Sequence, residues 1–351
     1  MRARPLRARP SSRDEGDLPA LGVIGTVVLD RIQPFIGEGR APSRPVRSMG
    51  GITYALHALA ALGPHPSAVV PILHLGADAS SFVRAELAGL GVDTRFLLST
   101  SARQNAVELR YTSPEQRHEV LSGGVPPLRP ADLGGFLREV DALYVNFVAG
   151  NELTLAGMRS VRRGFAGAIY ADLHSLLLGR TRAGLRLPRP LRAWREWVAC
   201  FDIVQCNAQE AALLRRGSRS AGPRSGTRGA GSRRGGSPRP LAEARAESLA
   251  REVLRLGPRL FIVTSGAGPV RAWPARGRSW RVTPPPGKRV RDPTGCGDVL
   301  GGAFCALHLL RGLPAGEALA RAVRAASLNA TRSGTDGLTD ELRGWAEHGH
   351  G

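Results

Sequence analysis

The sequence has almost no lysine. Lys288 is the single lysine among 49 basic residues, the others being arginine, and the formal net charge is +20. A basic surface selected for nucleic acid usually contains both residue types, whereas near-exclusive arginine with abundant alanine and glycine is typical of a GC-rich coding sequence. The charge therefore favours a solvated surface, with a polyanion partner as the alternative.

Long apolar runs and paired cysteines are also missing. No stretch of 18 apolar residues is present, which predicts that no helix spans a membrane. Residues 1–20 are rich in arginine but lack the apolar core of a secretory signal, and we expect them to form a disordered tail. The four cysteines show no CxxC spacing, so free thiols in a cytoplasmic protein are predicted.

Apolar runs alternate with helical patterns along most of the chain, and several of the helical patterns end at glycine. Continuous apolar strands alternating with helices predict an α/β fold, in which a mostly parallel sheet lies between helices. Strands are expected at residues 21–29, 67–73, 141–148, 168–174, 201–207 and 259–266, and helices at 52–63, 79–91, 241–257 and 315–334.

Two kinds of segment break this alternation. Residues 31–48 and 96–122 have the pattern of amphipathic strands, which predicts a small β lid beside the main sheet. Residues 215–240 contain no acidic and no large apolar residue, so we expect a disordered insert. Residues 21–345 are otherwise predicted to form a single domain.

The stretch "RDPTGCGDVLGGAF" begins a small-residue helix directly after a proline and two glycines. Gly295 and Gly297 permit a positive φ and a close backbone approach to a ligand. The first N–H groups of such a helix are unpaired and carry the positive end of its dipole, which favours an anion. Asp298 in the first turn either stabilises its own helix or serves as a general base beside a bound phosphate.

Two phosphate motifs are excluded by spacing. The sequence contains no GxxxxGK[ST], the signature of a P-loop. The "GCGDVLG" run has the glycine spacing of a dinucleotide fingerprint, but that fingerprint should follow a strand, and here it follows "PPPGKRVRDPT".

Several motifs in order give the chain a resemblance to the ribokinase-type (PfkB) carbohydrate kinases. "DPTGCGDVLGGAF" resembles the second signature of that family, and "GGITYALHALAALG" resembles the first. "VIGTVVLDRI", "LGADASSFVRAELAGLGVD", "NAQE" and "TSGAGPV" resemble its first strand, its GVD segment, its NxxE motif and its nucleotide loop. The resemblance covers residues 21–340, apart from the insert, and implies a ribokinase-like fold with a β lid.

The resemblance also implies a reaction, the transfer of the ATP γ-phosphoryl group to a hydroxyl of a sugar or sugar-like substrate. Asp298 would be the general base, and the N–H groups of Gly295, Cys296 and Gly297 would stabilise the charge on the transferred group. Asp30, at the end of the first strand, would bind the substrate together with Gly50 and Gly51.

The resemblance also assigns the residues that would bind ATP, the phosphoryl donor. "NAQE" is also a capping-box pattern, but the resemblance gives Asn207 and Glu210 a role in organising Mg²⁺ and its water near the phosphates. Nucleotide-binding positions would be Thr264, Gly266, Gly268 and Asn329, although a strand-to-turn glycine pair and a plain surface asparagine explain these residues too. Asp292 and Thr294 match positions where some relatives hold a monovalent cation.

The chain departs from the family at one substrate position, because Ala55 stands where many sugar kinases have asparagine. Tyr54 could supply a hydroxyl instead, or could be a core residue, and Asn146 near the end of a strand is a further substrate-binding candidate. A nucleoside kinase and a catalytically idle, nucleic-acid-associated binding protein are the alternatives to a sugar kinase. Exposed lid strands would also permit a homodimer through the lid.

Overall fold

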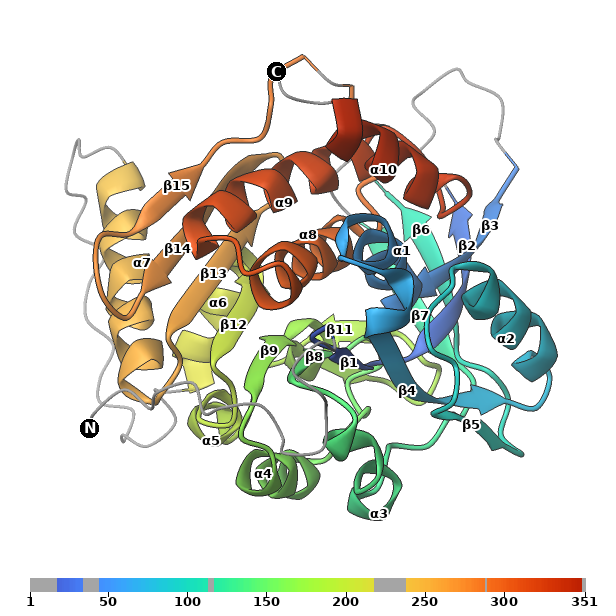
Figure 1. Ribbon diagram of the computed structural model, residues 1–351. Coiled ribbons are helices and arrows are strands. Elements are labelled where there is room, and N and C mark those ends of the chain that lie inside the picture. The colour runs from blue at the N-terminus through green and yellow to red at the C-terminus, as the bar shows by residue number, and fades with distance from the viewer. Residues whose placement is uncertain (1–17, 34–43, 113–116, 218–237, 288, 349–351) are drawn as a thin grey trace.

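The computed structural model describes residues 18–33, 44–112, 117–217, 238–287 and 289–348. A nine-stranded sheet forms its centre, with helices on both faces (Figure 1). In spatial order the strands are β15 (Trp280–Val282), β14 (Gly268–Pro274), β13 (Leu260–Ser265), β12 (Ile203–Asn207), β9 (Ala168–Asp172), β8 (Ala142–Asn146), β1 (Leu21–Ile24), β4 (Val69–Gly76) and β5 (Leu97–Thr100).

Seven of these strands, from β13 to β5, are parallel, and β14 and β15 are antiparallel additions at one edge. Alternate residues of the strands belong to two separate apolar cores, so that Leu143 and Val145 face one side and Tyr144 the other. A strand buried on both faces needs an uninterrupted apolar run, which is what the sequence supplies. The predicted α/β sandwich is therefore confirmed.

The helices divide between the two cores. One core contains residues of α1 (Ile52–Leu62), α2 (Ser80–Gly89), α8 (Cys296–Phe304), α9 (Ala315–Asn329) and α10 (Leu338–His348). The other contains residues of α3 (Pro130–Leu133), α4 (Leu155–Gly164), α5 (Trp194–Val198), α6 (Ala208–Gly217) and α7 (Pro238–Arg255). A π-helical segment, Cys305–Leu310, follows α8.

The lid is a second sheet of four strands, in the order β3 (Val46–Gly51), β2 (Val27–Gln33), β6 (Ala106–Tyr111) and β7 (Arg117–Ser122). The prediction of one strand over residues 21–29 is wrong, because the chain leaves the large sheet after Ile24 and enters the lid at Val27. Asp30 consequently lies within a lid strand, opposite Ser48 of β3, and not at the end of a central strand.

The lid boundaries also differ from the expected ones. Residues 97–100 form β5, whose parallel pairing with β4 extends the large sheet, because Leu97 is buried against that edge. The outer edge of β7 is bonded to a hairpin made by β10 (Leu178–Arg180) and β11 (Arg186–Pro188). The N–H of Leu121 in β7 donates to the carbonyl of Gly184 in this hairpin at 2.9 Å.

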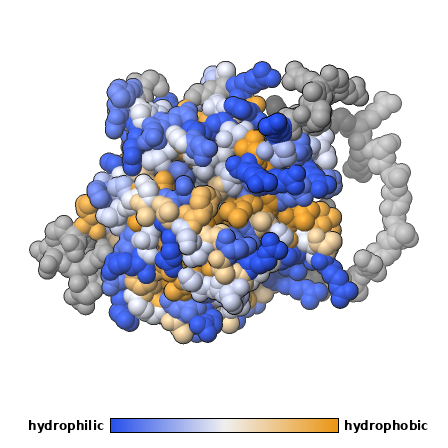
Figure 2. Space-filling view, turned by 90° about the vertical axis from the view of Figure 1, so that its right-hand side faces the viewer, coloured by the Kyte–Doolittle hydropathy of each residue, from blue (hydrophilic) through white to orange (hydrophobic). Residues whose placement is uncertain are grey.

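The face that lies on the right in Figure 1 is shown in Figure 2, where a band of apolar residues runs between hydrophilic ones. Among the described residues, the exposed large apolar side chains are Leu18, Phe82, Leu187 and Val290. None of the described helices is both long enough and apolar enough to cross a bilayer.

Two predictions concern segments that lie almost entirely outside the described residues. The predicted disordered tail, residues 1–20, coincides with them only at residues 18–20. The predicted insert, residues 215–240, coincides with them only where α6 ends and α7 begins.

Candidate active site

Four parallel strands end side by side beneath the start of α8. Asn146 of β8 lies next to Asp172 of β9, and Asn207 of β12 lies next to Thr264 of β13. Ligands of parallel α/β sheets bind at this carboxyl edge, where side chains of successive strands converge. Hydrogen bonds from Asn146 and Gln205 to residues 298 and 297 bring the first turn of α8 to the same edge.

Gly295 determines how the chain enters α8. Its φ is +76°, and a Cβ at this position would lie 2.3 Å from the ring of Tyr54. Tyr54 is in α1 and is 1% exposed, so the loop before α8 rests directly on a buried aromatic ring. Only glycine satisfies both the backbone angle and the contact.

The rest of this loop is held by side chains. The Asp292 Oδ1 atom accepts hydrogen bonds from the Thr294 N–H (2.9 Å) and the Thr294 hydroxyl (2.6 Å). The Asn329 Nδ2 group, at the end of α9, donates to the Thr294 carbonyl at 2.8 Å. Asn329 is 1% exposed and contacts the Cys296 sulfur at 3.4 Å, so its side chain supports this loop.

The backbone donors of the predicted anion site differ in availability. The N–H of Cys296 donates to the Pro293 carbonyl at 3.3 Å, whereas no described residue accepts from the N–H of Gly295 or Gly297. Gly297 does not have a positive φ, so that part of the prediction is wrong. A Cβ on Gly297 would come no closer than 3.7 Å to its described neighbours, an ordinary contact distance to the side chains of Gln205 and Asp172.

Asp298 is the third residue of α8, and its carboxylate is fixed by a neighbour on the sheet. The Asn146 Nδ2 group donates to Asp298 Oδ1 at 2.6 Å and to the Tyr144 hydroxyl at 3.0 Å. Asn146 is fully buried, and its own Oδ1 has no hydrogen-bond partner among the described residues. An orphaned buried acceptor is costly, so this atom is suited to receive a donor from a ligand.

The predicted substrate residues of the lid also converge here. Asp30 is 5% exposed, and its carboxylate lies so close to Gly50 that a Cβ there would be 1.7 Å from Oδ2. Gly51 has a φ of +64° at the junction of β3 with α1. Burial, followed by the charge of Asp30, raises the pKa of Tyr54, and the charges of Asp292 and Asp298 act in the same direction.

Asn207 and Glu210 form the capping box that their spacing indicates. The Asn207 Oδ1 atom accepts from the Glu210 N–H at 2.9 Å, and Glu210 Oε2 accepts from the Asn207 N–H at 2.7 Å. Glu210 Oε1 also accepts from Asn207 Nδ2 at 2.6 Å. The cap therefore fixes the carboxylate at the strand edge, where it is 6% exposed.

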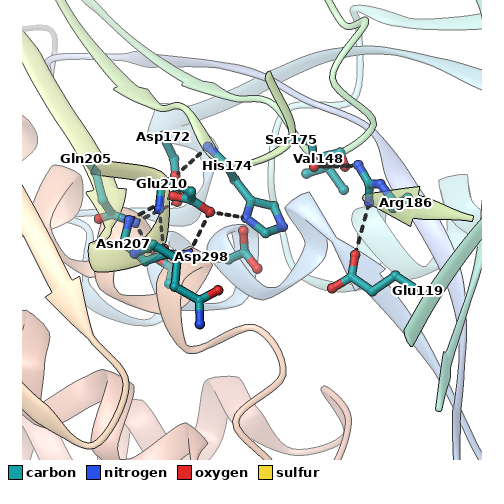
Figure 3. Close-up of polar contacts among 12 residues, drawn as sticks. Glu119, Val148, Asp172, His174, Ser175, Arg186, Gln205, Asn207, Glu210 and Asp298 are labelled. Atoms are coloured by element: carbon teal, nitrogen blue, oxygen red, sulfur yellow. Dashed lines mark hydrogen bonds and ion pairs between the residues drawn. The ribbon is translucent and has the colours of Figure 1, made fainter. Parts of the chain in front are cut away.

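His174 was missed by the sequence analysis. Its Nδ1 lies 2.9 Å from Glu210 Oε1, and Figure 3 shows its ring between Glu210 and the side of the site where Glu119 and Arg186 meet. Burial alone would lower the pKa of His174, but the hydrogen bond and charge of Glu210 raise it to about 9. No motif spacing could reveal this contact, because residues 174 and 210 meet only through the pairing of β9 with β12.

Gln205 was missed for the same reason. Its Nε2 group donates to Asp172 Oδ2 at 2.6 Å and to the Gly297 carbonyl at 3.0 Å, while its Oε1 accepts from the Tyr170 hydroxyl. Gln205 is 2% exposed, within the apolar run that predicts β12. It connects the sheet to the first turn of α8 and so fixes the orientation of the Gly297 peptide.

Asp172 is a buried carboxyl group of the site with a raised pKa. Burial raises the pKa of Asp172 to about 8, with the charge of Glu210 as the next cause.

Thr264 lies one residue before the end of β13 and pairs with Asn207, which places it next to the Asn207–Glu210 cap. Gly266 (φ +55°) lies in the tight turn that follows, and Gly268 begins β14 opposite Ser265.

The geometry combines an anion site with a carboxylate. Unpaired N–H groups at the start of α8 attract a phosphate, and Asp298 lies in the same turn, between the strand edge and the lid. A phosphate held there faces a base whose orientation Asn146 fixes. Such an arrangement can take a proton from a hydroxyl that attacks the bound phosphate.

Comparisons with known proteins identify the family and the fold. The family model described as pfkB family carbohydrate kinase matches residues 21–341. The fold is similar to that of ribokinase from Thermotoga maritima (TM-score 0.67, 18% identity, 94% of this chain and 100% of that one). It is also similar to a fructokinase with bound ATP from Xylella fastidiosa (0.67, 18%, 95% and 99%).

A further similar structure is a sulfate complex of a pyrophosphate-dependent kinase in the ribokinase family (TM-score 0.69, 18% identity, 90% of this chain and 96% of that one). At these identities the likeness shows the ribokinase-like fold. Comparison with the curated proteins gave no match.

The two glycines at the start of α8 should respond differently to alanine. Gly295→Ala forces a positive φ on alanine and a clash with Tyr54, and it should lower the free energy of unfolding by about 2 kcal/mol or more. Gly297→Ala has room and ordinary backbone angles, so its stability should be unchanged or slightly higher. Urea unfolding of both variants measures the difference, and equal losses would contradict the described loop.

The His174–Glu210 pair should make stability depend on pH. The folded pKa of His174 is raised above its usual 6.5, so its contribution is fully present below about pH 6.5 and is lost as pH rises through about 9. The difference in Tm between the wild type and His174→Gln should therefore shrink between pH 6.5 and 9. A difference that grows over this range would show that the imidazole is not held as a cation.

Proposed function

The chain belongs to the pfkB family of carbohydrate kinases, and on that premise we propose that it transfers the γ-phosphoryl group of ATP to a hydroxyl of a sugar or polyol, with Asp298 as the general base. It is a phosphotransferase with a hydroxyl acceptor, as its family is. The single observation that carries the proposal is the position of the Asp298 carboxylate, fixed by Asn146 within the turn that offers unpaired N–H groups to a phosphate.

In the proposed step, Asp298 takes the proton of the acceptor hydroxyl as its oxygen bonds to the γ-phosphorus. The bond from that phosphorus to the bridging oxygen breaks, and ADP leaves with the electron pair. Charge spreads over the oxygens of the transferred group in such a transition state. The N–H groups of Gly295 and Gly297, and that of Cys296 if it gives up its weak bond to Pro293, lie where they can stabilise this charge.

The acceptor would lie between the lid and the edge of β8. Asp30 and Asn146 are the polar side chains suited to its other hydroxyls, since Asn146 Oδ1 has no partner among the described residues. The similar structures favour a sugar or polyol over a nucleoside, since they include a ribokinase and a fructokinase.

The nucleotide would extend from the start of α8 along the ends of β12 and β13. Thr264 and the Gly266–Gly268 turn lie there beside the Asn207–Glu210 cap, and glycines let a phosphate chain approach the backbone closely. Asn329 supports this site indirectly, through the Thr294 carbonyl. Because one similar structure is of a pyrophosphate-dependent kinase, the choice of ATP needs a direct test.

Mg²⁺ fits this site through Glu210. Both oxygens of that carboxylate already accept hydrogen bonds, from Asn207 and from His174, which favours contact with the ion through water and not directly. When bound, Mg²⁺ would shield the charge of the phosphates. Glu210 would hold the water shell, and the cap would keep the carboxylate in place.

A monovalent cation fits the loop before α8. The Asp292 Oδ2 and Asn329 Oδ1 atoms are buried acceptors without a partner among the described residues. Asp292 and Asn329 would hold the cation and so stabilise the loop that presents Gly295. Cytoplasmic location, the absence of a nucleic acid partner and a homodimer through the lid stay predictions.

Replacing the base should abolish turnover but leave binding intact. Asp298→Asn keeps the size of the side chain and removes the proton acceptor, so kcat should fall by about 10²- to 10⁴-fold while the affinity for ATP changes little. The measurement is turnover with ATP or pyrophosphate as donor against a panel of sugars, polyols and nucleosides.

The matched control for this experiment is Asp141→Asn, another partly buried aspartate, which binds the N–H of Ala20 away from the site. Acceptor-stimulated turnover in Asp298→Asn at a rate close to that of the wild type would overturn the assignment of the base. Stimulation by nucleosides alone would overturn the acceptor class.

Alkylation of Cys296 should inactivate the enzyme. Cys296 is the first residue of α8 and is half-buried, whereas Cys200, Cys206 and Cys305 are buried. An adduct at Cys296 would fill the anion site, and bound ATP should protect the thiol. Iodoacetamide kinetics with and without ATP test this, with Cys296→Ala as an active, resistant control. Full modification without loss of activity would show that the thiol lies outside the site.

A further inference from the structure

A lid residue makes direct contact with the loop before α8. The Tyr111 hydroxyl, at the end of β6, lies 3.0 Å from the Thr294 Oγ1 atom and donates to Asp292 Oδ1 at 3.3 Å. Asp292 and Thr294 immediately precede Gly295, whose N–H is one of the unpaired donors of the anion site. The lid therefore touches the loop that presents this donor.

The other attachments of the lid are at its base and along its far side. The Arg186 guanidinium donates to the Val148 carbonyl at 2.5 Å and lies 3.5 Å from Glu119 of β7, which ties that strand to the core (Figure 3). On the side of β3, Ser48 contacts Thr335 through the Thr335 N–H at 3.2 Å. Of these three attachments, only that of Tyr111 reaches the loop before α8.

The same lid sheet carries the substrate residue Asp30. Asp30 of β2 pairs with Val107 of β6, and β6 runs on to Tyr111, so the acceptor-binding strand and the loop-binding residue are joined by a continuous ladder. The strand that carries Asp30 is thus hydrogen-bonded to the strand whose last residue contacts Asp292 and Thr294.

We propose that Tyr111 is a positioning residue that seats the closed lid on the loop before α8, so that the anion site is held in its working geometry only when the lid is closed. The proposal rests on the proposed kinase function and extends it, because it names how acceptor binding controls phosphoryl transfer. In the open state the loop keeps the Asp292–Thr294 bonds but lacks the lid contact.

One consequence of this proposal is that water is disfavoured as a phosphoryl acceptor. A loop that is held only in the closed state stabilises the transferred group chiefly when the hydroxyl acceptor, and not water, occupies the site. Loss of the Tyr111 hydroxyl should lower kcat for the acceptor by about tenfold, the effect of one hydrogen bond to a charged group. Acceptor-free hydrolysis of ATP should fall less, so the ratio of hydrolysis to transfer should rise.

The test uses Tyr111→Phe, which removes only the hydroxyl. Its matched control is Thr335→Val, an isosteric change that weakens the lid contact at Ser48 without touching the loop. Tyr111→Phe should lower kcat and raise the hydrolysis-to-transfer ratio, whereas Thr335→Val should raise the acceptor KM and leave that ratio at the wild-type value. The same ratio in Tyr111→Phe as in the wild type, or equal changes in both variants, would overturn the proposal.

A second readout follows the loop without turnover. The Cys296 thiol follows the loop directly, so its alkylation rate in the full-length protein, measured by peptide mass spectrometry, reports how firmly the loop is held. An acceptor that closes the lid should slow this alkylation several-fold in the wild type and in Thr335→Val, and less in Tyr111→Phe. Equal slowing in Tyr111→Phe and in the wild type would overturn the role of Tyr111, whereas an acceptor panel that neither slows alkylation nor stimulates turnover in the wild type would count against the proposed function.

Discussion

The contact between Gly295 and the ring of Tyr54 is the constraint on which the site depends. Tyr54 is buried in α1, and α1 packs against α8, so the ring fixes the position at which the chain enters α8. This position determines where the N–H groups and Asp298 lie relative to the strand ends. The geometry of the candidate site thus depends on helix packing in the core as much as on the loop itself.

The carboxylates of the site are oriented mainly by amide side chains. Asn146 binds Asp298, Gln205 binds Asp172, and Asn207 binds Glu210. An amide donor fixes the direction of a carboxylate without cancelling its charge, whereas a guanidinium would lower its pKa and weaken it as a base. His174 beside Glu210 is the one cationic partner among these three carboxyl groups in the described contacts. Asp172 differs from the other two because burial raises its pKa to about 8.

The sequence predicted those features whose signals are local. Apolar runs gave the parallel sheet, the spacing of Asn207 and Glu210 gave the cap, and the glycines before Asp298 gave the helix start. Contacts between distant segments had no such signal, as with Gln205 to Gly297 and His174 to Glu210. The break between β1 and β2 was missed because "GVIGTVVL" is an apolar run interrupted only by Thr26, and the two halves differ in their pairing partners. Residue roles, unlike the fold, still rest on the proposed chemistry.

The hairpin along β7 determines how the lid can move. Its base joins the core at several chain connections, and the bonds of β7 to residues 184–186 add an attachment along one side. A sheet fixed at its base and along one side has little freedom to lift as a whole, so it should twist. The β3 edge, which is held to the core by long, neutral hydrogen bonds between Ser48 and Thr335, should then move further than the β7 edge, which is held by a guanidinium.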